Sequence, residues 1–256
     1  MRLDVENGGQ GSPATGGPAH HSFVLFRHGE SAWNAADRFT GWTDVPLTDA
    51  GRQEARQVGQ ALRRAGCTFD LAVTSVLQRA VESLTIVLDE LGRPDLPVLQ
   101  DWRLNERHYG CLQGLGKADT VARLGSRRVG AWRRGYSERP PALEWDDRRH
   151  PRFDPRYAGL PPAQLPRAES LQDTVARLLP CWQAQIAPAL RRGRRVLCSA
   201  HGNSLRALVA YLENIPAHEI PAISIPTGAC IAYQLELDLS VRSRYDIFNP
   251  GGPDNV

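Results

Sequence analysis

The chain has 256 residues, of which 41% are hydrophobic, so it can bury a full core as one large domain or two small ones. Its 31 basic and 28 acidic residues leave a net charge of +3, which does not favour nucleic-acid binding. No apolar stretch approaches the roughly 20 residues that cross a bilayer, and the five scattered cysteines lack the spacing of a disulfide framework or a zinc site. We therefore expect a cytoplasmic protein that binds neither membranes nor nucleic acid.

The first part of the chain is expected to contain a tail, a buried strand and a helix. Residues 1–21 are rich in glycine and have too few large apolar side chains to repay ordering, so we expect a flexible tail without a catalytic role. The apolar run over residues 22–26 predicts a strand that leads into Arg27-His28-Gly29-Glu30. A helix is predicted over residues 52–64, with Thr48 as its N-cap and an end at Gly66.

The middle of the chain begins with another strand and helix. Residues 69–75 predict the strand, and residues 77–91 predict a helix that ends at Gly92, which gives a βαβα order. Residues 125–166 contain many prolines, arginines and tryptophans and show no clear period. We expect them to form an irregular insertion over the carboxyl edge of the sheet, above the active site.

The last third of the chain returns to regular elements. A helix is predicted over residues 170–190, and Pro180 is expected to bend it. A strand from residue 196, a helix over residues 204–212 and a final strand over residues 231–237 follow. The order of elements predicts a single α/β domain over residues 22–256, with three αβα layers and a mostly parallel sheet flanked by helices.

Two histidines follow the ends of apolar runs, and each precedes a glycine. His28-Gly29 ends the first run, and His201-Gly202 ends the run over residues 195–200, where a helix begins. A lone histidine in such a place is more often structural than catalytic. In open α/β sheets, however, ligands bind at the carboxyl ends of parallel strands, so the pair predicts one shared site with His28 as candidate nucleophile.

Cationic and polar side chains recur near other element ends. Arg79 lies at a strand-to-helix junction, where the amides of the helix start favour an anion, although a surface position is an open alternative. Lys117 is the only lysine in an arginine-rich chain, and chance exposure is an equal alternative for it. Glu106, which lies among polar residues 105–109, is the acid of this set, and the Arg133-Arg134 pair adds two more cations. Several arginines with one acid suit a phosphorylated anionic substrate.

From about residue 22 to residue 245, the chain resembles the cofactor-dependent phosphoglycerate mutases of the histidine phosphatase superfamily. The matching segments cover residues 27–34, 38–42, 74–80, 104–110, 132–135, 200–206 and 225–228. Arg27-His28-Gly29 alone marks only the superfamily, whereas the whole set marks the mutase branch. Ser31 also favours a mutase, because a branch that works mainly as a bisphosphoglycerate synthase typically has glycine there.

The resemblance implies a role for each matching residue. His28 would carry the phosphoryl group as phosphohistidine, His201 would stabilise that group in transfer, and Glu106 would exchange a proton with the substrate hydroxyl. Arg27 and Arg79 would hold the phosphoryl oxygens together with His201. The implied substrate contacts are Ser31, Asn34, Thr40, Gly41, Arg107, His108, Tyr109, Lys117, Arg133, Arg134, Gly202 and Asn203.

The activity that the resemblance implies is interconversion of 3-phosphoglycerate and 2-phosphoglycerate in glycolysis and gluconeogenesis. It implies 2,3-bisphosphoglycerate as the priming cofactor and a small phosphorylated acid as substrate. No metal is expected, because the candidate residues include no carboxylate cluster to hold one. A homodimer and a homotetramer both remain open. The alternatives are a histidine-type phosphomonoesterase, a bisphosphoglycerate synthase or phosphatase, and a phospholigand-binding protein that has lost catalysis.

Overall fold

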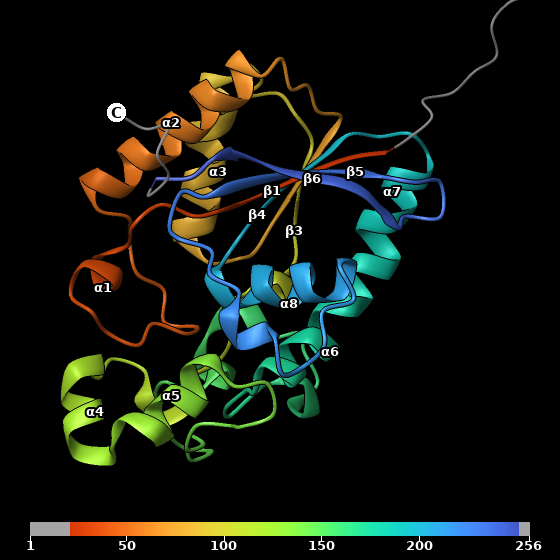
Figure 1. Cartoon of the computed structure of the whole chain (residues 1–256). Helices are drawn as coiled ribbons and strands as arrows, with labels where there is room; N and C mark the ends of the chain where they lie inside the picture. Colours follow the sequence, from red (N-terminus) through yellow and green to blue (C-terminus); the bar gives the residue numbers. More distant parts are fainter. Residues whose placement is uncertain (1–20, 251–256) are drawn as a thin grey trace, which may run out of the picture.

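A computed structural model describes residues 21–250 and contains a six-stranded sheet with the order β3-β2-β4-β1-β5-β6 (Figure 1). Strands β3, β2, β4 and β1 pair in parallel, and the β1–β5 and β5–β6 pairs are antiparallel. The prediction of a mostly parallel sheet is confirmed. The strands are β1 (His21–Arg27), β2 (Leu71–Thr74), β3 (Val98–Gln100), β4 (Val196–Ala200), β5 (Cys230–Leu235) and β6 (Val241–Phe248).

Helices cover both faces of this sheet. Helices α2 (Asp49–Arg64) and α3 (Gln78–Glu90) lie on one face, and α6 (Leu171–Cys181), α7 (Ala187–Arg191) and α8 (Gly202–Leu212) lie on the other (Figure 1). Alternate residues of β1 face the two layers: Val24 belongs to the core with α2 and α3, and Leu25 to the core with α6 and α8. The predicted three-layer αβα arrangement is confirmed.

Local sequence accounts for the predicted helix ends. The Thr48 side chain accepts a hydrogen bond from the Gly51 N–H at 3.0 Å, which caps the start of α2. Gly66 and Gly92 follow α2 and α3 with φ angles of +66° and +68°, a conformation that glycine adopts without strain. Of the expected tail, His21 begins β1, and the other residues lie outside the described part of the chain.

Strands β3 and β6 were not predicted from the sequence. Strand β3 has only three residues at the edge of the sheet, and its apolar pair Val98-Leu99 is too short to predict a strand. Strand β6 carries arginines at the opposite edge and follows the strand that the sequence predicts to be the last.

The helix predicted over residues 170–190 is divided into α6, which contains Pro180, a π-helical turn at Trp182–Ile186, and α7.

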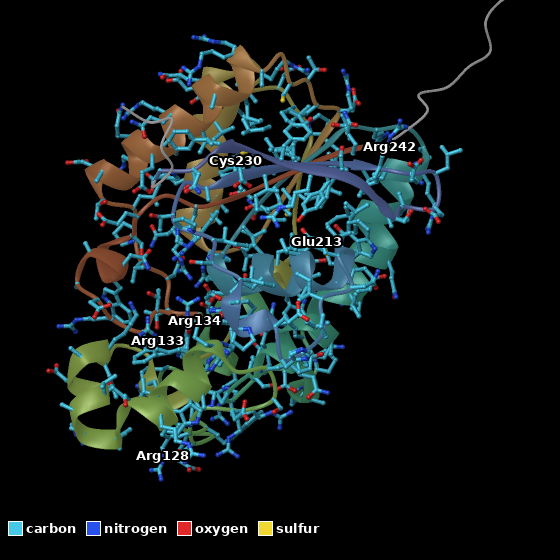
Figure 2. All side chains as sticks on the ribbon, in the orientation of Figure 1. Arg128, Arg133, Arg134, Glu213, Cys230 and Arg242 are labelled. Carbon is cyan, nitrogen blue, oxygen red and sulfur yellow. The ribbon has the colours of Figure 1, made fainter. Side chains whose placement is uncertain are left out.

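The expected irregular insertion begins with a helix, α5 (Ser126–Arg134), which follows α4 (Lys117–Leu124) and lies at a distance from the sheet, as does α1 (Ala32–Ala35) (Figure 1). Val129 and Trp132 are one turn apart and pack with Phe39, but the arginines around them conceal this short period. Figure 2 shows Arg133 and Arg134 pointing toward the body of the molecule and Arg128 pointing away from it.

After α5, the only regular elements of the expected insertion are three short 3-10 turns, between residues 151 and 164. The 3-10 turns of the described chain are Trp102–Leu104, Gly110–Leu112, Pro151–Phe153, Pro155–Tyr157, Pro162–Gln164 and Ile220–Ala222. No helix within residues 21–250 has the length and apolar character that crossing a membrane requires.

Candidate active site

The two histidines that follow apolar runs are brought together by the register of β1 and β4. Arg27 is paired with Ala200 across the two parallel strands, and the His28 N–H donates to the Ala200 carbonyl at 3.0 Å. His28 and His201 therefore leave neighbouring strands at the same level. Their ring centroids lie 4.9 Å apart, with 62° between the ring planes.

The hydrogen bonding of His28 fixes which ring nitrogen carries the proton. Its Nδ1 lies 2.6 Å from the Gly29 carbonyl oxygen, which can only accept, so Nδ1 is protonated and Nε2 keeps its lone pair. Burial, assisted by the charges of Arg79 and Arg27, holds the pKa of His28 well below its ordinary value. The imidazole is therefore neutral at physiological pH, as an attacking nitrogen must be.

His201 is fully buried and packs against the His28 ring. Its Nε2 lies 2.7 Å from the Ser75 hydroxyl, and its buried Nδ1 has no hydrogen-bond partner within residues 21–250. Burial and the nearby Arg79 and His28 place the pKa of His201 well below its ordinary value. Its neutral ring therefore has one buried nitrogen without a partner in the described chain.

The buried Arg79 and the partly buried Arg27 are cations that the main chain holds in place. Arg27 Nη1 donates to the Ile225 carbonyl at 2.8 Å, and Arg79 donates to the carbonyls of Thr43 and Gly41 at 3.0 and 2.8 Å. Burial lowers the pKa of Arg79 to about 10, so it stays charged at neutral pH. Within the described chain, neither guanidinium forms an ion pair with a carboxylate, so both can compensate a bound anion.

Glu106 lies near these cations and has a fixed carboxylate. Its Oε1 accepts the main-chain N–H of Arg107 at 2.8 Å and that of Asn203 at 3.1 Å. Asn203 lies in the first turn of α8, where the free amides favour a negative charge. The side chain is thus buried at a polar boundary between the segment after β3 and the start of α8.

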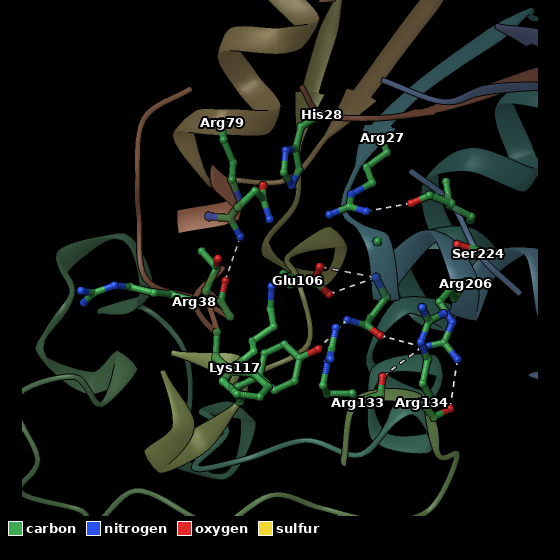
Figure 3. Close-up of a pocket in the computed structure, with 18 residues that line it drawn as sticks. Arg27, His28, Arg38, Arg79, Glu106, Lys117, Arg133, Arg134, Arg206 and Ser224 are labelled. Atoms are coloured by element: carbon green, nitrogen blue, oxygen red, sulfur yellow. Dashed lines mark hydrogen bonds between the residues drawn. The ribbon is translucent and has the colours of Figure 1, made fainter. Parts of the chain in front are cut away.

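A cavity of about 160 Å³ connects these groups with a second set of cations (Figure 3). In this view His28, Arg27 and Arg79 lie above Glu106, Lys117, Arg133 and Arg134 lie below it, and Arg38 and Arg206 are level with it on either side. The cationic lining residues within the described chain are Arg27, Arg38, Arg79, Lys117, Arg133, Arg134 and Arg206. Glu106 is the one carboxylate residue in that lining, so the cavity is strongly positive and selects anions.

Most residues that the sequence predicts for the site line this cavity. They are Arg27, His28, Asn34, Thr40, Gly41, Arg79, Glu106, Tyr109, Lys117, Arg133, Arg134, Gly202 and Asn203. Lys117 is not a free surface charge, because its Nζ lies 2.8 Å from the Asp37 carboxylate. Its ammonium therefore reaches the cavity while paired at the rim.

Ser31, Arg107, His108 and His201 are placed behind the lining rather than in it. Ser31 caps α1 and shares a hydrogen bond with the Asn34 side chain at 2.7 Å, so it orients a residue that does line the cavity. Arg107 donates to the Arg133 carbonyl at 2.8 Å. Both side chains therefore support the site in this structure, whereas the sequence predicts direct substrate contacts for them.

His108 differs most from its predicted place. Its ring is fully buried 5.8 Å from the Trp42 ring, and its Nδ1 accepts the Gly110 N–H at 3.1 Å. Burial, with smaller contributions from His150 and Arg177, lowers the pKa of His108 to about 3. A neutral, packed imidazole fixes the fold of this segment rather than offering a charge to a substrate.

Five lining residues were given no role from the sequence, although all but Ser224 lie in its matching segments. They are Arg38, Phe39, Arg206, Ser224 and Ile225. A pattern does point to Arg206, because it follows Asn203 by three residues on one face of α8, and its Nη1 donates to the Asn203 side chain at 2.9 Å. Within residues 21–250 there is also no group of three or more histidine, cysteine, aspartate or glutamate side chains that could hold a metal ion.

A model of the histidine phosphatase superfamily (branch 1) matches residues 23–148 and 142–240 of this sequence. The chain belongs to the histidine phosphatase superfamily. Paired strand-end histidines within a cage of arginines are what phosphoryl transfer through a histidine requires.

Solved structures similar to this chain include two of a mycobacterial glucosyl-3-phosphoglycerate phosphatase. The complex with inorganic phosphate is 26% identical, covers 88% of this chain and 95% of its own, and has a TM-score of 0.64. The complex with VO3 is also 26% identical, covers 83% and 92%, and has a TM-score of 0.64. The α-ribazole phosphatase from Shigella flexneri, at 22% identity, covers 86% and 94% with a TM-score of 0.62 and shares the fold. These comparisons support the superfamily and its phosphatases, and not specifically a mutase.

Proposed function

We propose that this chain takes a phosphoryl group from a small phosphorylated carboxylic acid onto His28 and passes it to an acceptor hydroxyl. The observation that carries this proposal is the presence of cations on both sides of Glu106 in one small cavity (Figure 3). One set surrounds His28, and the other includes Arg133, Arg134 and Lys117. A substrate with a phosphate at one end and a carboxylate at the other satisfies both sets.

The first step would form a bond between His28 Nε2 and phosphorus. The ester O–P bond breaks, and Glu106 in its acid form gives a proton to the departing oxygen, so an alcohol leaves rather than an alkoxide. Arg27, Arg79 and His201 would hold the phosphoryl oxygens, where charge is spread in the transition state. In the second step the carboxylate of Glu106 takes the proton from the acceptor as that oxygen attacks the phosphohistidine.

The reaction we favour is interconversion of 3-phosphoglycerate and 2-phosphoglycerate. Arg133, Arg134 and Lys117 would hold the carboxylate, so that either hydroxyl of the bound acid can be presented to phosphohistidine. The donor set also suits 2,3-bisphosphoglycerate, because Arg27 Nε, Arg79 Nε and Arg206 Nε are buried without partners in the described chain. When bound, that cofactor supplies the phosphoryl group that loads His28.

Hydrolysis is the second candidate, and the similarity to glucosyl-3-phosphoglycerate phosphatase favours it. The same first step would occur, and water would replace the sugar-acid hydroxyl as acceptor. The two candidates therefore share His28, Glu106 and the phosphate-binding cations, and they differ in whether the bound acid or water receives the phosphoryl group.

A coupled assay on one preparation separates the candidates. Isomerisation of 3-phosphoglycerate and release of inorganic phosphate are followed together, with and without added 2,3-bisphosphoglycerate. Isomerisation that rises with the cofactor and exceeds phosphate release supports the mutase. Phosphate release that exceeds isomerisation supports the phosphatase, and the absence of both reactions with an unlabelled His28 supports a binding protein.

A further inference from the structure

We propose that Arg177 and Glu169 are positioning residues that hold Glu106 where it exchanges a proton with the substrate. This inference rests on the proposed function of Glu106 and concerns two side chains that do not line the cavity. Arg177 belongs to α6, and Glu169 comes just before the N-cap residue of that helix.

The backbone that carries Glu106 has no regular structure of its own. Residues 106–109 belong to neither a helix nor a strand, although Glu106 and His108 are buried. Buried carbonyl and N–H groups in such a segment need partners from elsewhere in the chain. The placement of the Glu106 carboxylate therefore depends on what binds this backbone.

The Arg177 guanidinium binds the main chain that carries Glu106, on the side away from the cavity. Its Nη1 donates to the carbonyls of Trp102 and Arg103 at 3.3 and 2.6 Å. Its Nη2 donates to the carbonyls of Asn105 and Glu106 at 3.2 and 3.3 Å. One planar side chain thus fixes the main chain on both sides of residue 104, a geometry that the flexible ammonium of lysine does not reproduce.

Glu169 binds both Arg177 and the same main-chain segment. Its carboxylate receives two hydrogen bonds from Arg177, at 2.6 and 3.0 Å, and also accepts the His108 N–H at 2.8 Å. The side chains of Arg177 and Glu169 are only 6% and 5% exposed, so water does not compete with these bonds. The main chain is held at residue 106 by the arginine and at residue 108 by the glutamate.

Trp42 also binds the main chain at Glu106. Its Nε1 donates to the Glu106 carbonyl at 2.6 Å, and the Arg177 guanidinium lies 5.3 Å from the centre of the Trp42 ring. The Glu106 carbonyl therefore has two donors, and its carboxylate is left to interact with Asn203 and the cavity. Loss of the Arg177 guanidinium would let residue 106 move while His28 stays in place just after β1.

Two phosphoryl donors separate positioning of Glu106 from general damage. Both form the same bond from His28 Nε2 to phosphorus. The leaving oxygen of a phosphoglycerate ester needs the proton of Glu106 to depart as an alcohol, whereas acetyl phosphate releases acetate, which leaves as a stable anion without a proton. The measurement is the single-turnover rate at which each radiolabelled donor phosphorylates His28, and the result is the ratio of the two rates for each variant.

The variants are Glu106→Gln, Arg177→Lys and Glu169→Gln, with Arg139→Lys as matched control. Arg139 pairs with Asp173 of the same helix α6 and makes no hydrogen bond to residues 102–108. Glu106→Gln should slow labelling from the phosphoglycerate by about 10²–10⁴-fold, and Arg177→Lys and Glu169→Gln should slow it by about 10-fold to 100-fold. Acetyl phosphate should label all of them at nearly the wild-type rate, and Arg139→Lys should match wild type with both donors.

The ratio of two rates on one preparation does not depend on how much of the protein is folded. Equal slowing with both donors, or no slowing, in Arg177→Lys and Glu169→Gln would overturn the positioning role while Glu106→Gln still discriminates between donors. If Glu106→Gln itself does not discriminate, or if neither donor labels wild type, the proposed function fails first and the positioning role fails with it.

Discussion

The main chains at Gly29 and Gly51 approach so closely that a methyl group on Gly29 would lie 2.0 Å from the Gly51 carbonyl oxygen. A methyl group on Gly51 would lie equally close to the carbonyl oxygen of Glu30. The turn that supplies the hydrogen-bond acceptor for His28 is therefore packed directly against the first turn of α2. Neither contact can be relieved by rotating a side chain, because both partners are backbone.

Gly29→Ala should consequently displace His28, the proposed nucleophile, as well as destabilise the fold. We expect the free energy of unfolding to fall by about 1–3 kcal/mol and phosphorylation of His28 to slow measurably. Denaturant unfolding and rapid-quench labelling check the two effects. Gly66→Ala is the control, because a methyl group there meets nothing within 4 Å in the described chain and the strain of its φ of +66° is far from His28. A Gly29→Ala enzyme that is labelled at the wild-type rate would contradict this expectation.

Substitution of the two histidines should have different consequences. His28→Asn removes the attacking nitrogen, so both the acid-labile label and turnover should disappear. His201→Asn should keep the label on His28 but slow its formation by about 10²–10³-fold, the usual loss when one donor to a transition-state charge is removed. Acid-labile radiolabel on the intact protein is the measurement. Persistent label in His28→Asn would show that another residue carries the phosphoryl group.

Arg133→Ala should weaken recognition of the substrate's carboxylate end. Loss of one charge-assisted hydrogen bond, worth about 1.5–3 kcal/mol, should raise KM for 3-phosphoglycerate by about 10-fold to 100-fold. Labelling by acetyl phosphate, which has no carboxylate, should change little. Arg128→Ala on the same helix is the control, since that side chain points away from the body of the molecule (Figure 2). An equal rise in KM for Arg128→Ala would mean that the net charge of α5 matters rather than the place of Arg133.

The buried neutral His108 should make the fold sensitive to acid. Its pKa is about 3 in the folded chain, against an ordinary value of 6.5, so between these values the unfolded chain binds a proton that the folded chain does not. Stability is therefore lost as the pH falls below about 6.5, by about 1.4 kcal/mol per pH unit for this group. His108→Gln should remove that part of the slope in denaturant unfolding at pH 6.5 and pH 5. His218→Gln, at a side chain that is 80% exposed, should leave the slope as in wild type.

The sequence predicts the elements that have a local cause. Thr48 and Gly66 mark the ends of α2, and the strand-end positions of His28 and His201 predict that they meet. Helix α5 escapes prediction because arginines surround its one apolar pair, and strand β6 because Ser243 breaks the apolar face that alternates with its charged residues. Arg177 escapes for another reason: it binds backbone carbonyls, which every residue has, so no spacing of side chains reveals its partners.

The pairing of β1 with β4 has a consequence for how the enzyme should respond to heat. The 4.9 Å between the two imidazole rings is close to the spacing of neighbouring strands, about 4.7–4.9 Å, so the central hydrogen-bond ladder sets that distance. The cations that we propose to bind the carboxylate, in contrast, are carried by α4 and α5, outside the sheet. On warming, capture of a phosphoryl group from acetyl phosphate should therefore persist until the whole domain melts, after recognition of phosphoglycerate has already declined.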